Sequence, residues 1–195
     1  METKRYIRKS VLKMRDELSE HERKDKSRRI LEKVMQTSSY KEADVILSYV
    51  NFKSEVETEG LIAEALKSGK RVYCPRIDKE DMEFYRILGM DDLTVGYKGI
   101  REPMPKGECL LSGRDMSVQK CLMIMPGSVF DRERNRIGYG KGYYDRYLER
   151  YPQLPTVAVC FECQLVERVP AEAYDIKPDM IITETDVYKG NTAKE

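Results

Sequence analysis

The segment Arg136–Tyr151, RIGYGKGYYDRYLERY, combines bare backbone with charged side chains. Three glycines stand at alternate positions and lead into a segment with helical periodicity. A glycine-rich turn that enters a helix presents backbone N–H groups and the positive end of the helix dipole, and both favour phosphate. Arg136 and Lys141 add positive charge on either side. The segment therefore predicts a phosphate site, with an ordinary strand-to-helix turn as the alternative.

The glycine pattern differs from the two common nucleotide-binding motifs. No Gly-Lys pair is followed by Ser or Thr, and Tyr143 stands where the dinucleotide fingerprint needs its third glycine. Asp145 follows in the first turn of the predicted helix. A carboxylate there stabilises the helix dipole, and beside a polyphosphate it can also anchor Mg²⁺, which takes one or two protein oxygens. The residues alone leave both roles of Asp145 open.

A basic run accompanies the first segment with helical periodicity. An apolar stripe on this segment is predicted to face the core. Three basic residues flank the stripe on one side of the predicted helix, at spacings i, i+4 and i+11. Such a run is usually a solvated face, and it gains a function only if that side meets the glycine turn. The stripe consists of Ile7, Val11, Met14 and Leu18, and the basic residues are Lys4, Arg8 and Arg15.

Short apolar strands alternate with helices from residue 45 onward. This alternation predicts an α/β fold, with a mainly parallel sheet that helices cover on both faces. The pattern of Ser19 and Glu22 predicts the start of a second helix, so residues 2–37 form a helical pair. We expect a single three-layer α/β/α domain over residues 1–195. The predicted strands are 43–50, 71–75, 82–87, 121–127, 156–161 and 179–184, the predicted helices of this part are 57–70 and 143–150, and residues 89–118 are predicted to be loop.

Composition limits the classes of partner. Lys and Arg total 35 against 34 acidic residues, so no general attraction to nucleic acid or to an anionic membrane is expected. The N-terminal segment is charged throughout, which excludes a signal peptide or membrane span there. Five scattered cysteines without an export signal predict reduced thiols and a cytoplasmic protein.

Several motifs, in order, make the chain resemble the 5-formyltetrahydrofolate cyclo-ligase family, also called methenyltetrahydrofolate synthetases. The resemblance runs along nearly the whole chain and peaks in RIGYGKGYYDRYL. One position departs from it: family members usually carry glycine where this chain has Arg134, so a different turn or a positive φ is expected there. The other motifs are KRYIR at 4–8, EVET at 55–58, REPMP at 101–105, MPGSVFD at 125–131, AEAYD at 171–175 and IITE at 181–184.

The resemblance implies an activity. It implies ATP-dependent ring closure of 5-formyltetrahydrofolate to 5,10-methenyltetrahydrofolate, with Mg²⁺ as cofactor and with release of ADP and phosphate. The formyl oxygen would be phosphorylated first, and N10 would then attack the activated carbon. The implied partners are these small molecules, with no nucleic acid and no membrane, and we expect a monomer.

The resemblance also implies roles for particular residues. Arg136 and Lys141 would be catalytic, because they offset charge on the transferred phosphoryl group, and Asp145 and Asp175 would hold Mg²⁺. Glu55 would anchor the pterin through paired hydrogen bonds, although an acid at a helix N-terminus needs no such role. The implied ATP-binding residues are Lys4, Arg8, Arg136, Ile137, Gly138, Tyr139, Gly140, Lys141, Gly142, Tyr143 and Tyr144, and the implied folate-binding residues are Tyr49, Val50, Glu55, Tyr139, Gly140, Lys141, Gly142 and Tyr143.

Other functions stay open on the residues alone. A different phosphate-handling enzyme, such as a sugar-phosphate isomerase, would leave Lys4 and Arg8 idle on the surface. A non-catalytic ligand sensor or RNA-binding module would use the basic first helix, although the near-zero net charge disfavours RNA. A folate binder without turnover is a further alternative, because Arg134 replaces the family glycine.

Overall fold

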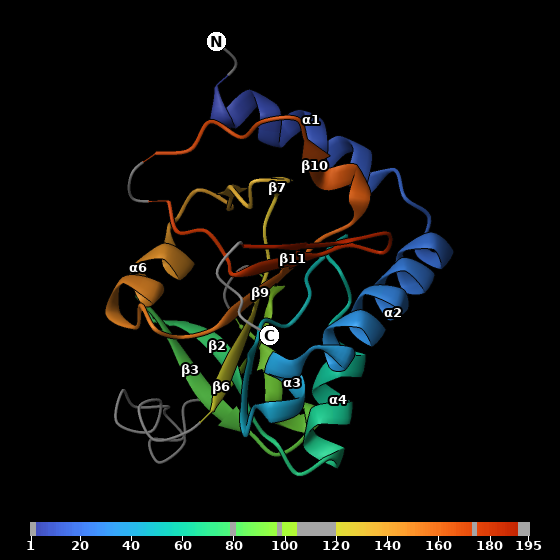
Figure 1. Ribbon diagram of the computed structural model, residues 1–195. Coiled ribbons are helices and arrows are strands. Elements are labelled where there is room, and N and C mark those ends of the chain that lie inside the picture. Colours follow the sequence, from blue (N-terminus) through green and yellow to red (C-terminus); the bar gives the residue numbers. More distant parts are fainter. Residues whose placement is uncertain (1–2, 79–80, 97–98, 105–119, 173–174, 191–195) are drawn as a thin grey trace.

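The computed structural model describes residues 3–78, 81–96, 99–104, 120–172 and 175–190. A seven-stranded sheet forms its centre (Figure 1). The five inner strands run parallel and the two edge strands run antiparallel to their neighbours. In spatial order the strands are β12 (Val187–Lys189), β11 (Met180–Ile182), β9 (Thr156–Val159), β6 (Cys121–Met125), β1 (Val45–Ser48), β2 (Arg71–Asp78) and β3 (Asp81–Ile87).

Helices cover both faces of this sheet. Three of them, α2 (Glu20–Gln36), α3 (Ser38–Glu42) and α4 (Glu59–Lys67), lie on one face, and α6 (Tyr143–Arg150) lies on the other (Figure 1). Successive side chains of a strand point to opposite faces, so β1 sends Ile46 toward α2 and α4, and Leu47 toward α6. The predicted α/β/α layering with a mainly parallel sheet is confirmed.

The first helix lies away from this sandwich. Helix α1 (Lys4–Asp16) packs over the 3₁₀ turn η4 (Glu162–Gln164) and over a second, three-stranded sheet with the order β10 (Leu165–Val166), β7 (Val129–Asp131), β8 (Arg136–Ile137) (Figure 1). A small core joins helix and sheet, made of Val11, Val129, Ile137 and Val169. This core fixes α1 beside the chain that follows β6. No helix in the described ranges is long and apolar enough to span a bilayer.

The inward face of α1 differs from the predicted stripe. Val11 is buried as expected, but Met14 is 44% exposed and Arg15 is only 4% exposed. Both positions border the inward face, since each lies within one turn of Val11. Arg15 takes the inner place because two hydroxyl groups accept its hydrogen bonds there. Placing Met14 in the core was therefore wrong.

Residues 89–118 are more regular than the predicted loop. They contain the 3₁₀ turn η1 (Met90–Asp92) and a two-stranded antiparallel sheet of β4 (Leu93–Val95) and β5 (Arg101–Pro103). Strands of three residues give too short a pattern to be recognised from polarity alone. Residues 97–98 and 105–118 of the predicted loop lie outside the described ranges.

Arg134 adopts the positive φ that the sequence offered as one of two outcomes. Its φ is +66°, in the left-handed region that favours glycine. The turn is held from both sides: the Arg134 N–H donates to the Asp131 carbonyl over 3.0 Å, and Nη1 donates to the Pro178 carbonyl over 2.7 Å. The buried Asp131 carboxylate accepts from the N–H of Asn135 and of Val169. These contacts hold Arg134 in its strained conformation.

The strain at Arg134 predicts an order of stability between two variants. Arg134→Ala and Arg134→Gly both lose the guanidinium contact, but only alanine keeps the left-handed penalty of an L-residue, about 1 kcal/mol. We expect the glycine variant to be more stable than the alanine variant by about that amount in urea unfolding. Equal stability, or a more stable alanine variant, would contradict a positive φ at this position.

Candidate active site

The glycine turn, residues 136–142, connects β8 to α6. Gly140 and Gly142 have φ of +93° and +64°, so both need the freedom of glycine. Gly142 is the N-cap of α6 and has no side chain with which to cap this helix end. The first-turn N–H groups therefore have no acceptor on the N-cap residue, which is the arrangement that binds anions at helix N-termini.

The basic side of α1 meets the glycine turn. Arg8 Nε donates to the Gly138 carbonyl over 2.9 Å. A Cβ on Gly140 would stand 3.5 Å from Arg8 Nη1, so the end of the guanidinium lies against bare backbone. Arg8 therefore meets the glycine turn, which is the contact that a functional role of the basic run requires. Its terminal nitrogens and the open end of α6 together form a cationic surface.

Lys4 and Asp175, predicted for phosphate and for metal, pair with each other. Lys4 Nζ lies 2.6 Å from Asp175 Oδ2 and 2.6 Å from Glu172 Oε2. Burial alone would lower the pKa of Lys4, but hydrogen bonds to the two carboxylates raise it. Lys4 therefore stays charged at neutral pH. The segment around Asp175 is tied to the start of α1 by these ion pairs.

Arg136 and Asp145 form the second pair, in which the guanidinium is buried and the carboxylate is half-buried. Arg136 is 6% exposed, and its Nη2 donates to Asp145 Oδ1 over 2.7 Å. Nη1 reaches the Pro126 carbonyl at 3.3 Å. Among the described residues, Arg136 Nε and Ser128 Oγ are buried polar atoms without a hydrogen-bond partner. Such atoms are rare and costly, and a ligand oxygen is a natural partner for them.

The loop after β1 holds Glu55. The Glu55 side chain is only 9% exposed, and Oε2 accepts a hydrogen bond from the Phe52 N–H over 2.9 Å. Burial raises the pKa of Glu55, and the Tyr139 hydroxyl, the Phe52 N–H and the Arg15 charge oppose that rise. Further hydrogen-bond donors would therefore stabilise the ionised form of this carboxylate. Tyr139 brings the glycine turn and the Glu55 loop together.

The remaining predicted residues divide into core and surface. Tyr49 and Val50 lie in the main core, where the Tyr49 hydroxyl donates to the Val56 carbonyl over 2.8 Å. Ile137 is buried against α1, so only its backbone can meet a ligand. Lys141 is exposed. Tyr143 and Tyr144 are half-buried, and the Arg136 guanidinium lies 6.0 Å from the ring centre of Tyr144.

Sequence reasoning missed two residues of this region. Arg15 was noticed in the basic run but not assigned to the site, and Ser54 carries no motif signal. In the structure Arg15 Nε donates to Ser54 Oγ over 3.0 Å, and Arg15 Nη1 donates to the Tyr139 hydroxyl over 2.7 Å. The only available signal was the seven-residue spacing from Arg8, which places both on one side of α1.

A preformed metal cluster is not seen among the described residues. No three side chains of His, Cys, Asp and Glu gather there as a metal site. Asp145 and Asp175 each hold a basic residue instead. This donor set fits Mg²⁺ held mainly by phosphate oxygens with one or two carboxylates, because such an ion needs no cage of protein ligands.

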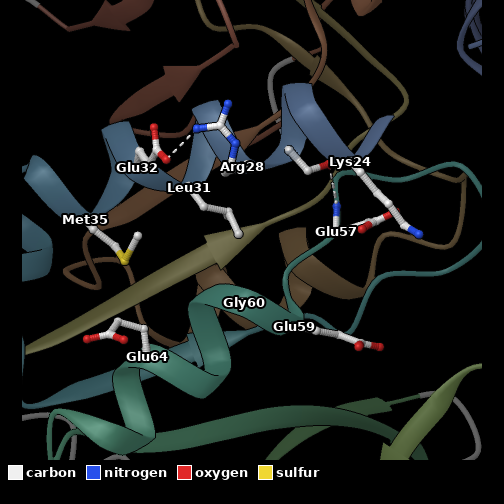
Figure 2. A pocket seen from close by; sticks show the side chains of 10 residues that line it. Lys24, Arg28, Leu31, Glu32, Met35, Glu57, Glu59, Gly60 and Glu64 are labelled. Atoms are coloured by element: carbon white, nitrogen blue, oxygen red, sulfur yellow. Dashed lines mark hydrogen bonds and ion pairs between the residues drawn. The ribbon is translucent and has the colours of Figure 1, made fainter. Parts of the chain in front are cut away.

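A groove of about 530 Å³ lies elsewhere, between α2 and α4 (Figure 2). None of the predicted site residues is among its described lining. Several of its charged side chains are occupied in surface ion pairs, such as Arg28 with Glu32 and Lys24 with Glu20. The groove therefore lacks the convergent cations of the glycine turn. Its described lining is Lys24, Ser27, Arg28, Leu31, Glu32, Met35, Glu57, Glu59, Gly60 and Glu64.

Comparison with known proteins points to one family. The pattern of the 5-formyltetrahydrofolate cyclo-ligase family matches residues 1–184. The chain is 30% identical over 189 residues to the 5-formyltetrahydrofolate cyclo-ligase of Mus musculus, covering 93% of each chain. The solution structure of Aquifex aeolicus 5,10-methenyltetrahydrofolate synthetase superposes with a TM-score of 0.84 and 33% identity, covering 98% of this chain and 95% of that one. A Mycoplasma pneumoniae 5,10-methenyltetrahydrofolate synthetase, 22% identical with a TM-score of 0.73, covers 94% of this chain and 99% of its own and shows the same fold.

The buried Arg136–Asp145 pair predicts a stability effect. Arg136→Ala leaves the Asp145 carboxylate without its partner and empties a buried site, so we expect the free energy of unfolding to fall by about 3 kcal/mol in urea titration. Arg150→Ala is the matched control, because Arg150 is an exposed arginine of α6 that pairs with Glu83. That variant is expected to lose about 1 kcal/mol or less. Equal losses would contradict a structural role for the buried pair.

Proposed function

The chain belongs to the 5-formyltetrahydrofolate cyclo-ligase family, a family of ligases, and from that membership we propose that it cyclises 5-formyltetrahydrofolate to 5,10-methenyltetrahydrofolate with ATP and Mg²⁺. ADP and phosphate would be released. The observation that carries the proposal is the meeting of Arg8 with the glycine turn, next to the buried Arg136–Asp145 pair. An idle surface helix, as a sugar-phosphate isomerase would have, does not explain that contact.

The chemistry explains why such a site is needed. A formamide carbon is a poor electrophile, because its nitrogen donates electrons into the carbonyl group. Transfer of the γ-phosphoryl group to the formyl oxygen turns that oxygen into part of a leaving group. N10 then attacks the carbon and loses its proton, and the carbon–oxygen bond breaks as hydrogen phosphate departs. The protein must align ATP with the formyl oxygen, offset charge and keep water out.

The nucleotide side of the site would be built from α1 and the glycine turn. Arg8 has terminal nitrogens at the turn, and Lys4 lies on the same side of α1. The backbone N–H groups of residues 137–144 would cradle phosphate oxygens at the open end of α6. Arg136 is the buried cation and Lys141 the exposed one, and both would offset charge on the transferred group.

Asp145 and Asp175 would hold Mg²⁺ jointly with the phosphates of ATP. The ion would neutralise phosphate oxygens during transfer. Without ligands the two carboxylates balance Arg136 and Lys4. The chain therefore carries its own counterions at the places where phosphate and metal would arrive.

The folate side would be formed by the loop after β1 together with the glycine turn. Glu55 would accept paired hydrogen bonds from the ring amide and exocyclic amine of the pterin. Tyr139, Gly140, Lys141, Gly142 and Tyr143 would face both substrates. Tyr49 and Val50, which are buried in the main core, would line the folate pocket.

The rest of the proposal concerns the whole chain. We propose that residues 1–195 act as one domain, in which the N-terminal helices complete the nucleotide side. Small molecules would be its substrates, with no nucleic acid or membrane partner. A monomeric state and a cytoplasmic location stay predictions from the sequence.

The activity is tested by mixing the purified protein with 5-formyltetrahydrofolate and Mg-ATP and following the near-ultraviolet band of the methenyl product. We expect ATP-dependent growth of that band. Lys141→Ala should lower kcat by about 100-fold, the usual effect of removing one group that stabilises charge in the transition state. Because Lys141 is exposed, the free energy of unfolding of this variant should equal that of the parent protein.

The matched control is Lys13→Ala, which removes an exposed lysine of α1 that lies within 4.0 Å of Glu17 and outside the site. This variant should turn over like the parent protein. Folate binding without any ATP-dependent band would indicate a binder rather than an enzyme. Neither binding nor turnover would overturn the proposed function.

The raised pKa of Glu55 gives a second test. Glu55→Gln should weaken 5-formyltetrahydrofolate binding by about 10- to 100-fold at neutral pH, because the ionised acceptor is lost. Affinity of the parent protein should fall as pH is lowered through the raised pKa of Glu55, whereas the variant should show no such dependence. Calorimetric titrations between about pH 4 and 8, the range in which carboxylates titrate, measure both the affinity lost in the variant and the pH dependence of affinity.

Stability should move in the opposite sense. Ionising the buried Glu55 costs folding free energy, so the parent protein loses stability as pH rises from the ordinary value of 4.5 through the raised pKa. Glutamine does not ionise, so the free energy of unfolding of Glu55→Gln relative to that of the parent protein should rise over this pH range and then level off. A constant difference across the window would show that Glu55 titrates normally.

A further inference from the structure

Arg15 is the one residue of the basic run whose guanidinium is almost wholly inside the protein. It is 4% exposed, while Lys4 and Arg8 are half-buried. Two of its hydrogen bonds go to hydroxyl groups on different loops: Nε donates to Ser54 Oγ over 3.0 Å, and Nη1 donates to the Tyr139 hydroxyl over 2.7 Å. Ser54 belongs to the loop after β1, and Tyr139 belongs to the glycine turn.

These two loops are the proposed binding sites of the two substrates. Ser54 directly precedes Glu55, the proposed pterin anchor, and its hydroxyl donates to Asp16 on α1. Tyr139 stands between Gly138 and Gly140, in the turn proposed for phosphate. The Arg15 Cζ atom also lies 5.9 Å from the centre of the Tyr139 ring. A single buried cation therefore contacts both halves of the site.

We propose that Arg15 is a positioning residue that couples the two substrate sites, so that each substrate binds more tightly when the other is present. The proposal rests on the proposed function, since it assigns ATP to the glycine turn and the folate to the Glu55 loop. Arg15 itself touches neither substrate. It acts through Tyr139 on one side and Ser54 on the other.

The physical reason is the cost of an unsatisfied buried cation. A hydrogen bond from a buried charged donor is stronger than one between neutral groups, so Arg15 resists movement of either hydroxyl. The surroundings of Tyr139 do not hold this side chain fully in place, because the tyrosine is 46% exposed and is flanked by two glycines. Phosphate bound at the turn would hold Tyr139, and with it Arg15, Ser54 and the neighbouring Glu55. The first ligand would then order these residues, and the second ligand would bind without that entropy cost.

Hydrogen bonding to Glu55 strengthens the link. The Tyr139 hydroxyl that accepts from Arg15 also acts as a donor toward the Glu55 carboxylate, which Phe52 N–H holds from the other side. A tyrosine held in one place therefore opposes the rise that burial causes in the pKa of the pterin anchor. Linkage requires the effect to be reciprocal, so folate must favour ATP by the same factor.

The test is a set of calorimetric titrations on the full chain. The dissociation constant of 5-formyltetrahydrofolate is measured alone and in the presence of Mg²⁺ with an ATP analogue whose β–γ bond cannot be hydrolysed. The ratio of the two constants is the coupling factor. We expect about tenfold for the parent protein, within the usual range for coupled sites. Titrating the analogue with and without the folate should return the same factor.

Three variants distinguish coupling from simple stabilisation. Arg15→Met should reduce the coupling factor to about 1, and Ser54→Ala should reduce it in part, because the bond to Tyr139 remains. Arg29→Met is the matched control: Arg29 also ties a helix to a strand end, through the Glu184 carbonyl at 3.1 Å, but touches neither loop. Its coupling factor should equal that of the parent. A merely structural Arg15 would change stability or single affinities and leave the ratio intact.

The outcomes separate this proposal from the function on which it rests. A parent protein that binds both ligands without coupling, or variants that keep the parent's coupling factor, would overturn the role of Arg15 alone. A parent protein that binds neither ligand would overturn the proposed function and this proposal with it. If Arg15→Met does not fold, Ser54→Ala decides, because an unchanged ratio there contradicts the two-sided link.

Discussion

The site depends on the close approach of two guanidinium groups to bare backbone. A Cβ on Gly138 would stand 3.1 Å from Arg136 Nη1, and a Cβ on Gly140 would stand 3.5 Å from Arg8 Nη1. The first distance is tighter than ordinary packing, and the second is already a van der Waals contact. Gly138 therefore makes room for the Arg136 guanidinium, and Gly140 is required by its positive φ rather than by space, at a turn that also leaves the end of α6 open. Helix α1 can supply one of these cations only because its small core with β7 and β8 fixes it beside the turn.

Charge in this region is balanced locally rather than by the whole chain. The formal net charge is +1, so no long-range field draws in a polyanion. Arg136 is balanced by Asp145, and Lys4 by Asp175 and Glu172. Burial makes unpaired charges costly, so these pairs stabilise the site without ligands. Under the proposed function, phosphate would replace Asp145 and Asp175 beside the basic residues, and Mg²⁺ would replace Arg136 and Lys4 beside the two carboxylates.

Periodicity was sufficient for the architecture but not for its small parts. The helices α2, α4 and α6 are long enough to show a helical period, and the inner strands stand out as short apolar runs, so the α/β class follows from their alternation. The strands β7, β8 and β10 have two or three residues, too few for any pattern, although they place α1 over the glycine turn. Arg15 shows the limit most clearly. Polarity assigned the inward place on α1 to Met14, whereas Arg15 occupies it because it donates hydrogen bonds to Ser54 and Tyr139, which are distant in sequence. The positive φ at Arg134 was foreseen only because the family resemblance provided a glycine for comparison, and the roles of Glu55 and Asp175 came from that resemblance as well.

The central claim is that phosphate binds where α1 meets the glycine turn. Chemical-shift mapping with ¹⁵N-labelled protein and a non-hydrolysable ATP analogue with Mg²⁺ tests it most directly. We expect the largest shifts at the amides of Gly138, Gly140 and Gly142 and at the side-chain Nε–H of Arg8, which bonds to the Gly138 carbonyl without ligand. The account would be contradicted if these groups showed no shift and the shifts lay instead along the groove between α2 and α4, at Glu32 and Glu64.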